Sequence, residues 1–286
     1  MCPGWTHVAV HVSPSAAELT DRMVGAPSEV TVLDVRYVQG GDPAAALAAY
    51  HAGHVPGAAY VDLDTALAAP PGPGGRHPLP DVGVFEAAMR DAGVRSGRPV
   101  VVYDDWGGRA AARAWWLLRF HGHDDVRVLD GGWTAWQAAG GAVETGAVGV
   151  SPGDFAATGG GGMPVVEADG VLDVAVVVDA RAPERWRGEV EPIDPVAGRV
   201  PGAVNVPTPD NLGPDGRFRP ASELAELYAA VGAVPGADVA AYCGSGVTAA
   251  HDVLAMEVAG VRAALYPGSW SGWITDPERP VETGLD

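Results

Sequence analysis

Short valine-rich runs alternate along the chain with alanine-rich stretches. The runs at residues 31–33, 100–102 and 176–178 are bounded by turn residues and have the length of buried strands. Residues 110–120 and 221–231 have the composition of helices. Strands that alternate with helices form βα units, in which helices cover both faces of a mainly parallel sheet. The pattern therefore predicts an α/β fold.

The same motifs occur twice, in the same order. Val-Leu-Asp-Val-Arg around Asp34 matches Val-Val-Asp-Ala-Arg around Asp179, 145 positions later, and a Val-Pro-Gly-Ala segment recurs with the same offset. An apolar run that ends at Asp104 loosely matches one that ends at Cys243. A Gly-x-Trp-x-x-Trp segment then follows in each half. Four matched blocks in one order indicate a diverged duplication.

The length agrees with a duplicated domain, since 286 residues exceed the usual domain size of roughly 100–200 residues. Residues 146–164 are rich in glycine, alanine and proline, which is typical of a flexible connector. We therefore expect a first domain at residues 1–145, a linker at residues 146–164 and a second domain at residues 165–286. Each domain is predicted to be an α/β unit.

Charge excludes several classes of function. The chain has 18 basic and 36 acidic residues, a net charge of −18, and it contains no lysine. Nucleic acids and anionic membranes should be repelled, and lysine-based Schiff-base or phosphate chemistry is excluded. Apolar stretches fall short of the roughly 20 residues that cross a bilayer, and the first residues lack the charged start of a secretion signal. We expect a cytoplasmic protein.

Cys243 lies in the segment Cys-Gly-Ser-Gly-Val-Thr, between an apolar run at residues 240–242 and a helical stretch at residues 248–256. The glycines allow main-chain amides to turn toward the thiol, and the start of the helix adds partial positive charge. The loop therefore predicts a nucleophilic thiolate rather than a buried structural cysteine. A cysteine phosphatase is disfavoured, because Ala249 stands where its phosphate-binding arginine would be. Cys2 and Cys243 are too few for a disulfide framework or a zinc site.

The matched blocks and the cysteine loop together resemble the two-domain rhodanese-type sulfurtransferases, over residues 30–273. The resemblance implies tandem rhodanese-like domains, each a mainly parallel sheet flanked by helices. It implies that Cys243 takes sulfane sulfur from a small donor, holds it as a persulfide and passes it to a thiol such as thioredoxin, or to cyanide. Asp104 occupies the aligned position in the first domain, which should be catalytically silent. Neither a metal nor an organic cofactor is implied.

The residues that follow the cysteine indicate which sulfur donor the protein uses. Loops of the thiosulfate-preferring branch carry two cations there, whereas the neutral Gly244 and Ser245 resemble the 3-mercaptopyruvate branch. That resemblance implies a Ser-His-Asp set, carried here by Ser245, His77 and Asp64, which would deliver the proton that an enolate leaving group needs. From the residues alone, His77 is better explained as a loop histidine and Asp64 as a helix cap.

Donor binding is expected at the loop and at an arginine. The resemblance assigns the donor carboxylate to Arg187 within Trp-Arg-Gly, and it leaves a second arginine position occupied by Ile193. Arg199 is expected to face solvent. The remaining substrate-binding positions form the anion cradle itself: Gly244, Gly246, Val247 and Thr248.

Two alternatives remain open at this point. The missing second arginine favours a thiosulfate:cyanide sulfurtransferase. A non-catalytic module that senses redox state or carries a persulfide is also compatible with the acidic composition and the silent first copy. The Asp-x-Arg pairs Asp34–Arg36 and Asp179–Arg181 recur in both halves, so they are predicted to be structural.

Overall fold

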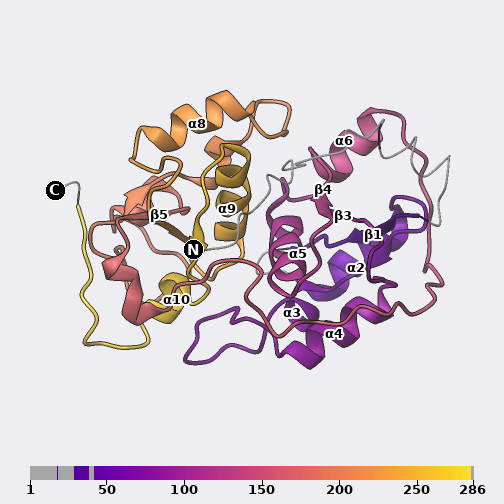
Figure 1. Ribbon diagram of the computed structural model, residues 1–286, viewed down its shortest axis with the longest axis horizontal. Helices are drawn as coiled ribbons and strands as arrows, with labels where there is room; N and C mark the ends of the chain where they lie inside the picture. The colour runs from indigo at the N-terminus through magenta and orange to yellow at the C-terminus, as the bar shows by residue number, and fades with distance from the viewer. Residues whose placement is uncertain (1–17, 19–28, 39–41, 285–286) are drawn as a thin grey trace, which may run out of the picture.

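The computed structural model describes residue 18 and residues 29–38 and 42–284, so Cys2 lies outside the described residues. Two α/β domains lie side by side (Figure 1), and each contains a parallel sheet flanked by helices. This confirms the predicted fold class. The sheets have the strand orders β2-β1-β3-β4 and β6-β5-β7-β8, which are the same order in each domain.

The first domain begins its sheet with a fully buried valine-rich strand that pairs in parallel with its neighbours on both sides. Its strands are β1 (Thr31–Asp34), β2 (Ala59–Tyr60), β3 (Val100–Tyr103) and β4 (Val126–Val128). Its helices are α2 (Pro43–Ala52), α3 (Leu63–Ala66), α4 (Val82–Asp91), α5 (Arg109–Phe120) and α6 (Gly132–Ala138).

The second domain repeats this plan with the same register. Asp34 pairs with Tyr103 in the first sheet, and Asp179 pairs with Tyr242 in the second. Its strands are β5 (Val176–Asp179), β6 (Val204–Asn205), β7 (Val239–Tyr242) and β8 (Ala264–Leu265). Its helical segments are η1 (Ala168–Asp173), α7 (Pro183–Trp186), η2 (Thr208–Asn211), α8 (Ala221–Ala229), α9 (Thr248–Val258) and α10 (Ser269–Trp273).

An aspartate ends the first strand of each domain and binds the arginine two residues later. Arg36 forms a bidentate ion pair with Asp34, at 2.7 Å between Nη2 and Oδ2, and Arg181 pairs with Asp179 at the same distance. All of these side chains are buried. Each arginine also donates to main-chain carbonyl oxygens of the following loop, at Gly53 and Gly198. The pairs therefore tie a strand to its crossover connection, as the recurrence in both halves predicted.

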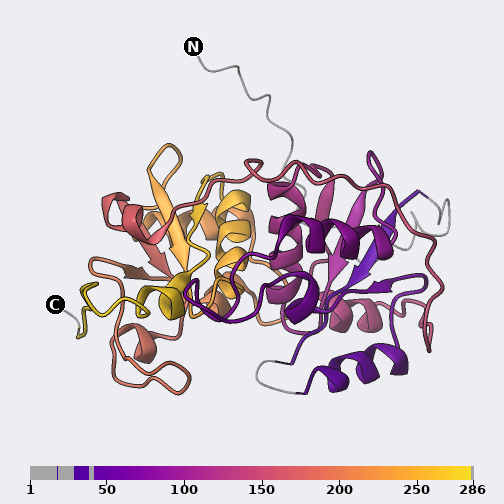
Figure 2. The same ribbon diagram turned by 90° about the horizontal axis from the view of Figure 1, so that it is seen from below.

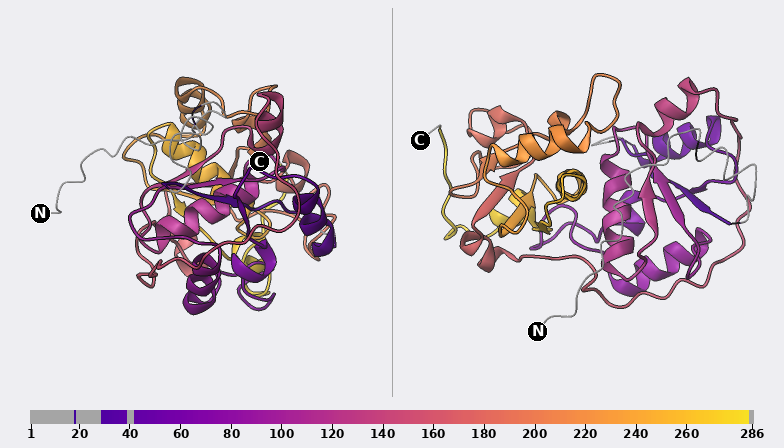
Figure 3. Two further views of the ribbon diagram at one scale, coloured as in Figure 1. Left: turned by 90° about the vertical axis from the view of Figure 1, so that its right-hand side faces the viewer. Right: turned by 45° about the horizontal axis from the view of Figure 1, so that its top comes forward.

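Helices α5 and α9 pack against each other where the domains meet (Figure 3, right), and they join the two cores. One cluster of buried apolar side chains extends from Leu33 of the first domain to Met256 of the second. Arg119 of α5 and Glu257 of α9 form an ion pair across the same contact. Because the apolar core is continuous, the domains pack as one unit.

The glycine-rich stretch at residues 146–164 packs on the first domain. Phe155 is 2% exposed and contacts the ring of Phe85. Its amide donates to the carbonyl oxygen of Val94, and its carbonyl oxygen accepts from Arg90 Nε at 2.6 Å. An apolar anchor and main-chain hydrogen bonds therefore hold this stretch to the first domain, which its glycine-rich composition did not indicate.

The loop between α3 and α4, residues 67–81, leaves the first domain and reaches the second (Figure 2). We call it the crossing loop. The main-chain amide of Arg76 donates to Ser271 Oγ at 3.0 Å, and Thr275 Oγ1 donates to the carbonyl oxygen of Pro73 at 3.2 Å. These contacts carry His77 from the first domain to the edge of the second sheet.

Candidate active site

Cys243 directly follows β7, and the loop at residues 243–247 leads into α9. The cysteine therefore lies at the carboxyl edge of a parallel sheet, where α/β proteins bind ligands. Its Sγ accepts from the amide of Gly246 at 3.1 Å and, more weakly, from that of Ser245 at 3.5 Å. The residue is 2% exposed and belongs to the apolar core cluster. Amides thus face the sulfur as predicted, although the surroundings are drier than the sequence indicated.

The backbone of the loop requires glycine at position 246, whereas Gly244 leaves room for neighbouring side chains. Gly246 has φ +82°, and a Cβ there would overlap the carbonyl oxygen of Pro267. At Gly244, a Cβ would lie 2.8 Å from Nη2 of Arg76 and 3.6 Å from the terminal nitrogens of Arg185. The loop can therefore bring its main chain close to both guanidinium groups. Val247 is buried beside it, and Thr248 is the first residue of α9.

The segment before α10 holds the other side of the cysteine loop. The Cys243 amide donates to Ser269 Oγ at 3.1 Å, and the Trp270 amide donates to the Cys243 carbonyl oxygen at 2.9 Å. Ser269 has φ +53°, a left-handed conformation that is uncommon for a residue other than glycine. Sequence reasoning missed Ser269, because the aligned position in the first copy is Gly132 and a serine there carries no pattern.

The predicted Ser-His-Asp set comes together in the structure. His77 Nδ1 lies 2.8 Å from Ser245 Oγ, and His77 Nε2 lies 3.5 Å from Asp64 Oδ1. Burial, together with the positive charges of Arg113 and Arg76, lowers the pKa of His77 to about 4. His77 is therefore neutral near pH 7, and its contact with Asp64 is a long polar contact rather than an ion pair. With the proton on Nε2 facing Asp64, Nδ1 can accept from the Ser245 hydroxyl; this tautomer is assigned from the hydrogen-bond partners.

The low pKa of His77 is testable by NMR. We expect the ring C–H resonance of His77, assigned with His77→Gln, to titrate with a midpoint of about 4. Since the ordinary histidine value is about 6.5, the unfolded chain binds a proton first, and the free energy of unfolding should decrease as pH falls from about 6.5 toward 4. A midpoint near 6.5 would show that His77 is solvated in solution and does not lie in the packed arrangement described above.

Arg76 and Arg185 lie beside the cysteine loop, one from each domain. Asp194 binds both: Arg76 Nη1 forms an ion pair with its Oδ1, and Arg185 Nη2 lies 3.3 Å from its Oδ2. Glu191 accepts from Arg185 Nε at 3.1 Å and from Nη2 at 2.6 Å. Arg76 Nη2 and Arg185 Nη1, which face Gly244, have no hydrogen-bond partner among the described residues. These nitrogens can bind an anion next to the sulfur.

Arg187 is placed differently from the prediction. Its Nε and Nη2 donate to Glu189 at 2.8 and 2.9 Å on the exposed side of the chain. Arg185, in α7, is directed toward the loop instead. Arg199 is also placed differently from the expectation: it is 2% exposed, it is ion-paired with Glu282, and it lies 4.2 Å over the ring of Trp186. The expectation that Arg199 faces solvent was therefore wrong.

Sequence reasoning missed three arginines near the site, and only one of them carries a signal in the sequence. Arg76 directly precedes His77, and Arg185 stands two residues before Arg187, so neither forms a separate motif. Arg113 is different, since it is a charged residue in the middle of the apolar helix α5 and is fully buried. A fully buried charge in the middle of such a helix indicates a specific partner.

Asp104 occupies the corresponding loop of the first domain. Its carboxylate accepts from the amides of Trp106 and Gly108 at 2.8 Å and of Ala111 at 2.9 Å. Burial raises the pKa of this carboxyl, and these three amides oppose that shift. The loop therefore folds as an anion cradle and is filled by a side chain of its own.

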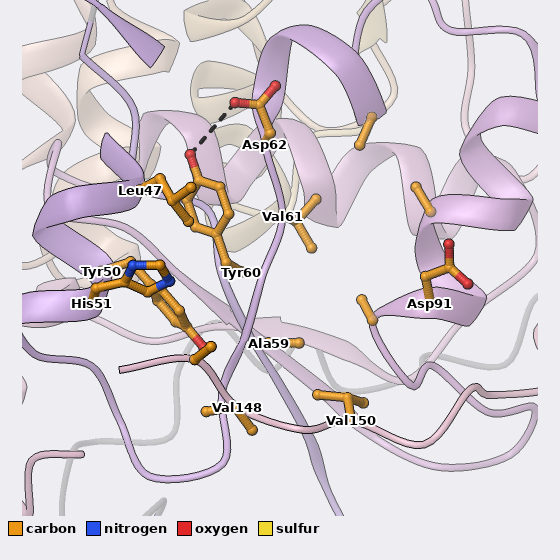
Figure 4. Close-up of a pocket in the computed structure, with 14 residues that line it drawn as sticks. Leu47, Tyr50, His51, Ala59, Tyr60, Val61, Asp62, Asp91, Val148 and Val150 are labelled. Atoms are coloured by element: carbon orange, nitrogen blue, oxygen red, sulfur yellow. Dashed lines mark hydrogen bonds between the residues drawn. The ribbon is translucent and has the colours of Figure 1, made fainter. Parts of the chain in front are cut away.

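Other features of the described residues do not add to this site. A cavity of about 480 Å³ lies between α2, β2 and α4 (Figure 4), where Tyr60 and Asp62 face each other at 3.5 Å. Its lining comes from the first domain and residues 147–150, and it excludes the cysteine loop. Within the described ranges, His, Cys, Asp and Glu side chains form no group of three that could hold a metal, and no helix is long and apolar enough to cross a membrane.

Comparison with known proteins agrees with this architecture. The family model of the rhodanese-like domain matches residues 15–139 and again residues 167–276. Two bacterial relatives cover nearly the whole chain, and their names mark the assignments as provisional. A Pseudomonas aeruginosa 3-mercaptopyruvate sulfurtransferase is 46% identical over 90% of this chain and 93% of its own, and a Mycobacterium tuberculosis thiosulfate sulfurtransferase, SseB, is 44% identical over 94% and 96%.

Solved structures give the same result. The crystal structure of SseA from Escherichia coli, described as a 3-mercaptopyruvate sulfotransferase, superposes with a TM-score of 0.77 at 33% identity, over 91% of this chain and 98% of that chain. The 3-mercaptopyruvate sulfurtransferase from Leishmania major superposes with a TM-score of 0.80 at 28% identity, over 93% and 75%. The chain therefore belongs to the rhodanese-like family, as a sulfurtransferase with two rhodanese-like domains.

Proposed function

We propose that this chain transfers sulfane sulfur from 3-mercaptopyruvate to a nucleophilic acceptor through a persulfide at Cys243. The observation that carries the proposal is the contact of neutral His77 with Ser245 at 2.8 Å, two residues from the thiol. A proton relay is needed when a carbon–sulfur bond breaks, and it has no role when sulfite leaves thiosulfate. Relatives named 3-mercaptopyruvate sulfurtransferase support the same choice.

The sulfur transfer follows from the positions of the side chains. The Cys243 thiolate attacks the donor sulfur, the new sulfur–sulfur bond forms, and the electrons of the broken carbon–sulfur bond leave on pyruvate enolate. Ser245 and His77 pass the proton of the donor thiol to the enolate carbon, which gives pyruvate and leaves the persulfide as an anion, with Asp64 orienting the histidine. The persulfide anion stays in the cradle formed by the amides of residues 245 and 246. An acceptor nucleophile then attacks its outer sulfur and restores the thiolate.

Arg76 and Arg185 would bind the donor carboxylate. Their free nitrogens converge on Gly244, whereas the hydrogen bonds of Arg187 go to Glu189. A pair of guanidinium groups matches a planar carboxylate better than a single one. The second arginine that the resemblance led us to expect is absent at Ile193. In this proposal Arg76 of the crossing loop takes its role from the first domain.

The first domain would not turn over a donor. A carboxylate cannot carry sulfane sulfur, and the Asp104 side chain already fills the loop that would hold a persulfide. The first domain would instead contribute His77, Asp64 and Arg76 to the site. The expected thiol or cyanide acceptor and the cytoplasmic location stay predictions, as does the assignment of residues 146–164 as the linker between domains.

Thiosulfate is the second candidate donor. The relative from M. tuberculosis carries that name at nearly the same identity, so overall similarity does not separate the donors. Thiosulfate is also a small anion that Arg76 and Arg185 could bind. A persulfide carrier or redox sensor would share Cys243 but would not turn over either donor.

A substitution at Ser245 distinguishes the two donors. We expect kcat/KM to be higher for 3-mercaptopyruvate than for thiosulfate, and Ser245→Ala to lower kcat with 3-mercaptopyruvate by about 10²-fold because the enolate loses its proton relay. With thiosulfate the same variant should stay within about threefold, since sulfite leaves without protonation at carbon. Ser222→Ala serves as a matched control, because Ser222 is an exposed residue of α8 away from both loops of the site. A higher kcat/KM for thiosulfate, or equal losses with both donors, would refute the proposed donor.

A further inference from the structure

Arg113 is a buried cation without a carboxylate partner among the described residues. It lies in the middle of α5, in the first domain, and it is 0% exposed. Its hydrogen bonds go to main-chain carbonyl oxygens, at 3.2 Å for Leu67 and His77 and 3.3 Å for Pro78 and Gly246. A fully buried guanidinium is costly unless a negative charge compensates it.

These four acceptors belong to the two segments that build the site. Leu67, His77 and Pro78 lie in the crossing loop, and Gly246 lies in the cysteine loop. Gly246 is also the residue whose amide donates to Cys243 Sγ at 3.1 Å. One side chain therefore holds the segment that carries His77 against the segment that carries the sulfur.

A thiolate at Cys243 would supply the negative charge that Arg113 lacks. The pKa of Arg113 is lowered to about 10 by burial, against an opposing contribution from the charge of Cys243. The charge of Cys243 opposes in the same way the lowering of the Arg76 pKa by burial. The other charges around the thiol largely compensate each other: Arg76 and Arg185 are bound to Asp194, and Arg185 is also bound to Glu191. His77 is neutral near pH 7, since its pKa is about 4, and Asp64 lies beyond it at 3.5 Å.

We propose that Arg113 is a positioning residue of the active site, which sets the distance between His77 and the cysteine loop and supplies, from the first domain, a positive charge that stabilises the thiolate form of Cys243. This role adds to the proposed function and rests on it only for the kinetic readout.

The test compares three variants of the full chain by the pH profile of Cys243 alkylation with iodoacetamide, followed on the Cys243 peptide by mass spectrometry. With Arg113→Met, the alkylation rate at about pH 6.5 should fall roughly tenfold, and the midpoint of the profile should rise by about one unit, because the positive charge is lost. Arg113→Lys keeps the charge and should retain the wild-type midpoint. It should still lose kcat with 3-mercaptopyruvate by at least about fivefold, since a single ammonium cannot span four carbonyl oxygens.

Arg119→Met is the matched control, because it removes a guanidinium from the same helix and an ion pair between the domains without touching either loop. Its profile should equal that of the wild type. An unshifted profile for a folded Arg113→Met, checked by circular dichroism, would overturn the electrostatic role. If Arg113→Met does not fold, Arg113→Lys decides: a wild-type kcat would overturn the positioning role, and a raised midpoint would overturn the charge argument. Alkylation needs no donor, so these results stay separate from a failure of the proposed sulfur transfer.

Discussion

Cys243→Ser is expected to abolish sulfur transfer from both donors, with kcat reduced by at least about 10³-fold, because a hydroxyl cannot hold sulfane sulfur and is not ionised near neutral pH. The amides of residues 245 and 246 would remain in place, so the loss would be chemical rather than structural. The measurement is intact-protein mass spectrometry after incubation with each donor. The wild-type chain should gain about 32 Da, one sulfur, and lose it to cyanide or a reduced thiol.

Cys2→Ser is the control for this experiment, since the sequence contains two cysteines. It should gain and transfer sulfur as the wild type does. Sulfur transfer that persists in Cys243→Ser would show that the loop after β7 is not where the persulfide forms. A wild-type chain that gains sulfur but does not pass it on would favour the persulfide-carrier alternative.

Arg185→Met is expected to raise KM for 3-mercaptopyruvate by about 10- to 100-fold, because one guanidinium–carboxylate interaction contributes roughly 1.5–3 kcal/mol. Arg76→Met should have a similar effect, since its Nη2 faces the same space beside Gly244. The change should appear mainly in KM, because these groups bind the part of the donor that does not react. Steady-state kinetics of both variants measure the effect.

Arg187→Met is the matched control and decides between two assignments of the donor-binding arginine. Its side chain is bound to Glu189 at the surface, so kinetics within about twofold of the wild type are expected. Should Arg187→Met raise KM while Arg185→Met does not, the resemblance in the sequence would have been the better guide. Thermal unfolding of each variant separates weakened binding from the loss of the ion pairs to Asp194.

The fold could be predicted because its signals are local and occur twice. Valine-rich strands, alanine-rich helices and turn residues report main-chain preferences over a few positions, and a second copy at a constant offset confirms them. The cysteine loop could be located for the same reason, since a strand, two glycines and a helix start are consecutive in the chain. The packing of residues 146–164 could not be predicted, because the contact of Phe155 with Phe85 depends on a distant surface.

The site was harder to predict where it depends on contacts between domains. His77 and Ser245 are 168 positions apart, and only the path of the crossing loop brings them within 2.8 Å. Arg76 and Arg185 converge for the same reason, whereas the motif that contains Arg187 specifies an arginine but not the direction of its side chain at the end of α7.

The sequence by itself determined a duplicated α/β protein, a thiol in a turn of main-chain amides and the absence of lysine chemistry, because these follow from residue type and neighbouring positions. The tertiary structure alone decided which charges surround that thiol. A buried guanidinium from α5 and a loop from the first domain reach the cysteine of the second through packing that residue spacing does not encode. Electrostatic interactions depend on distance in space, and the apolar contact between α5 and α9 sets those distances.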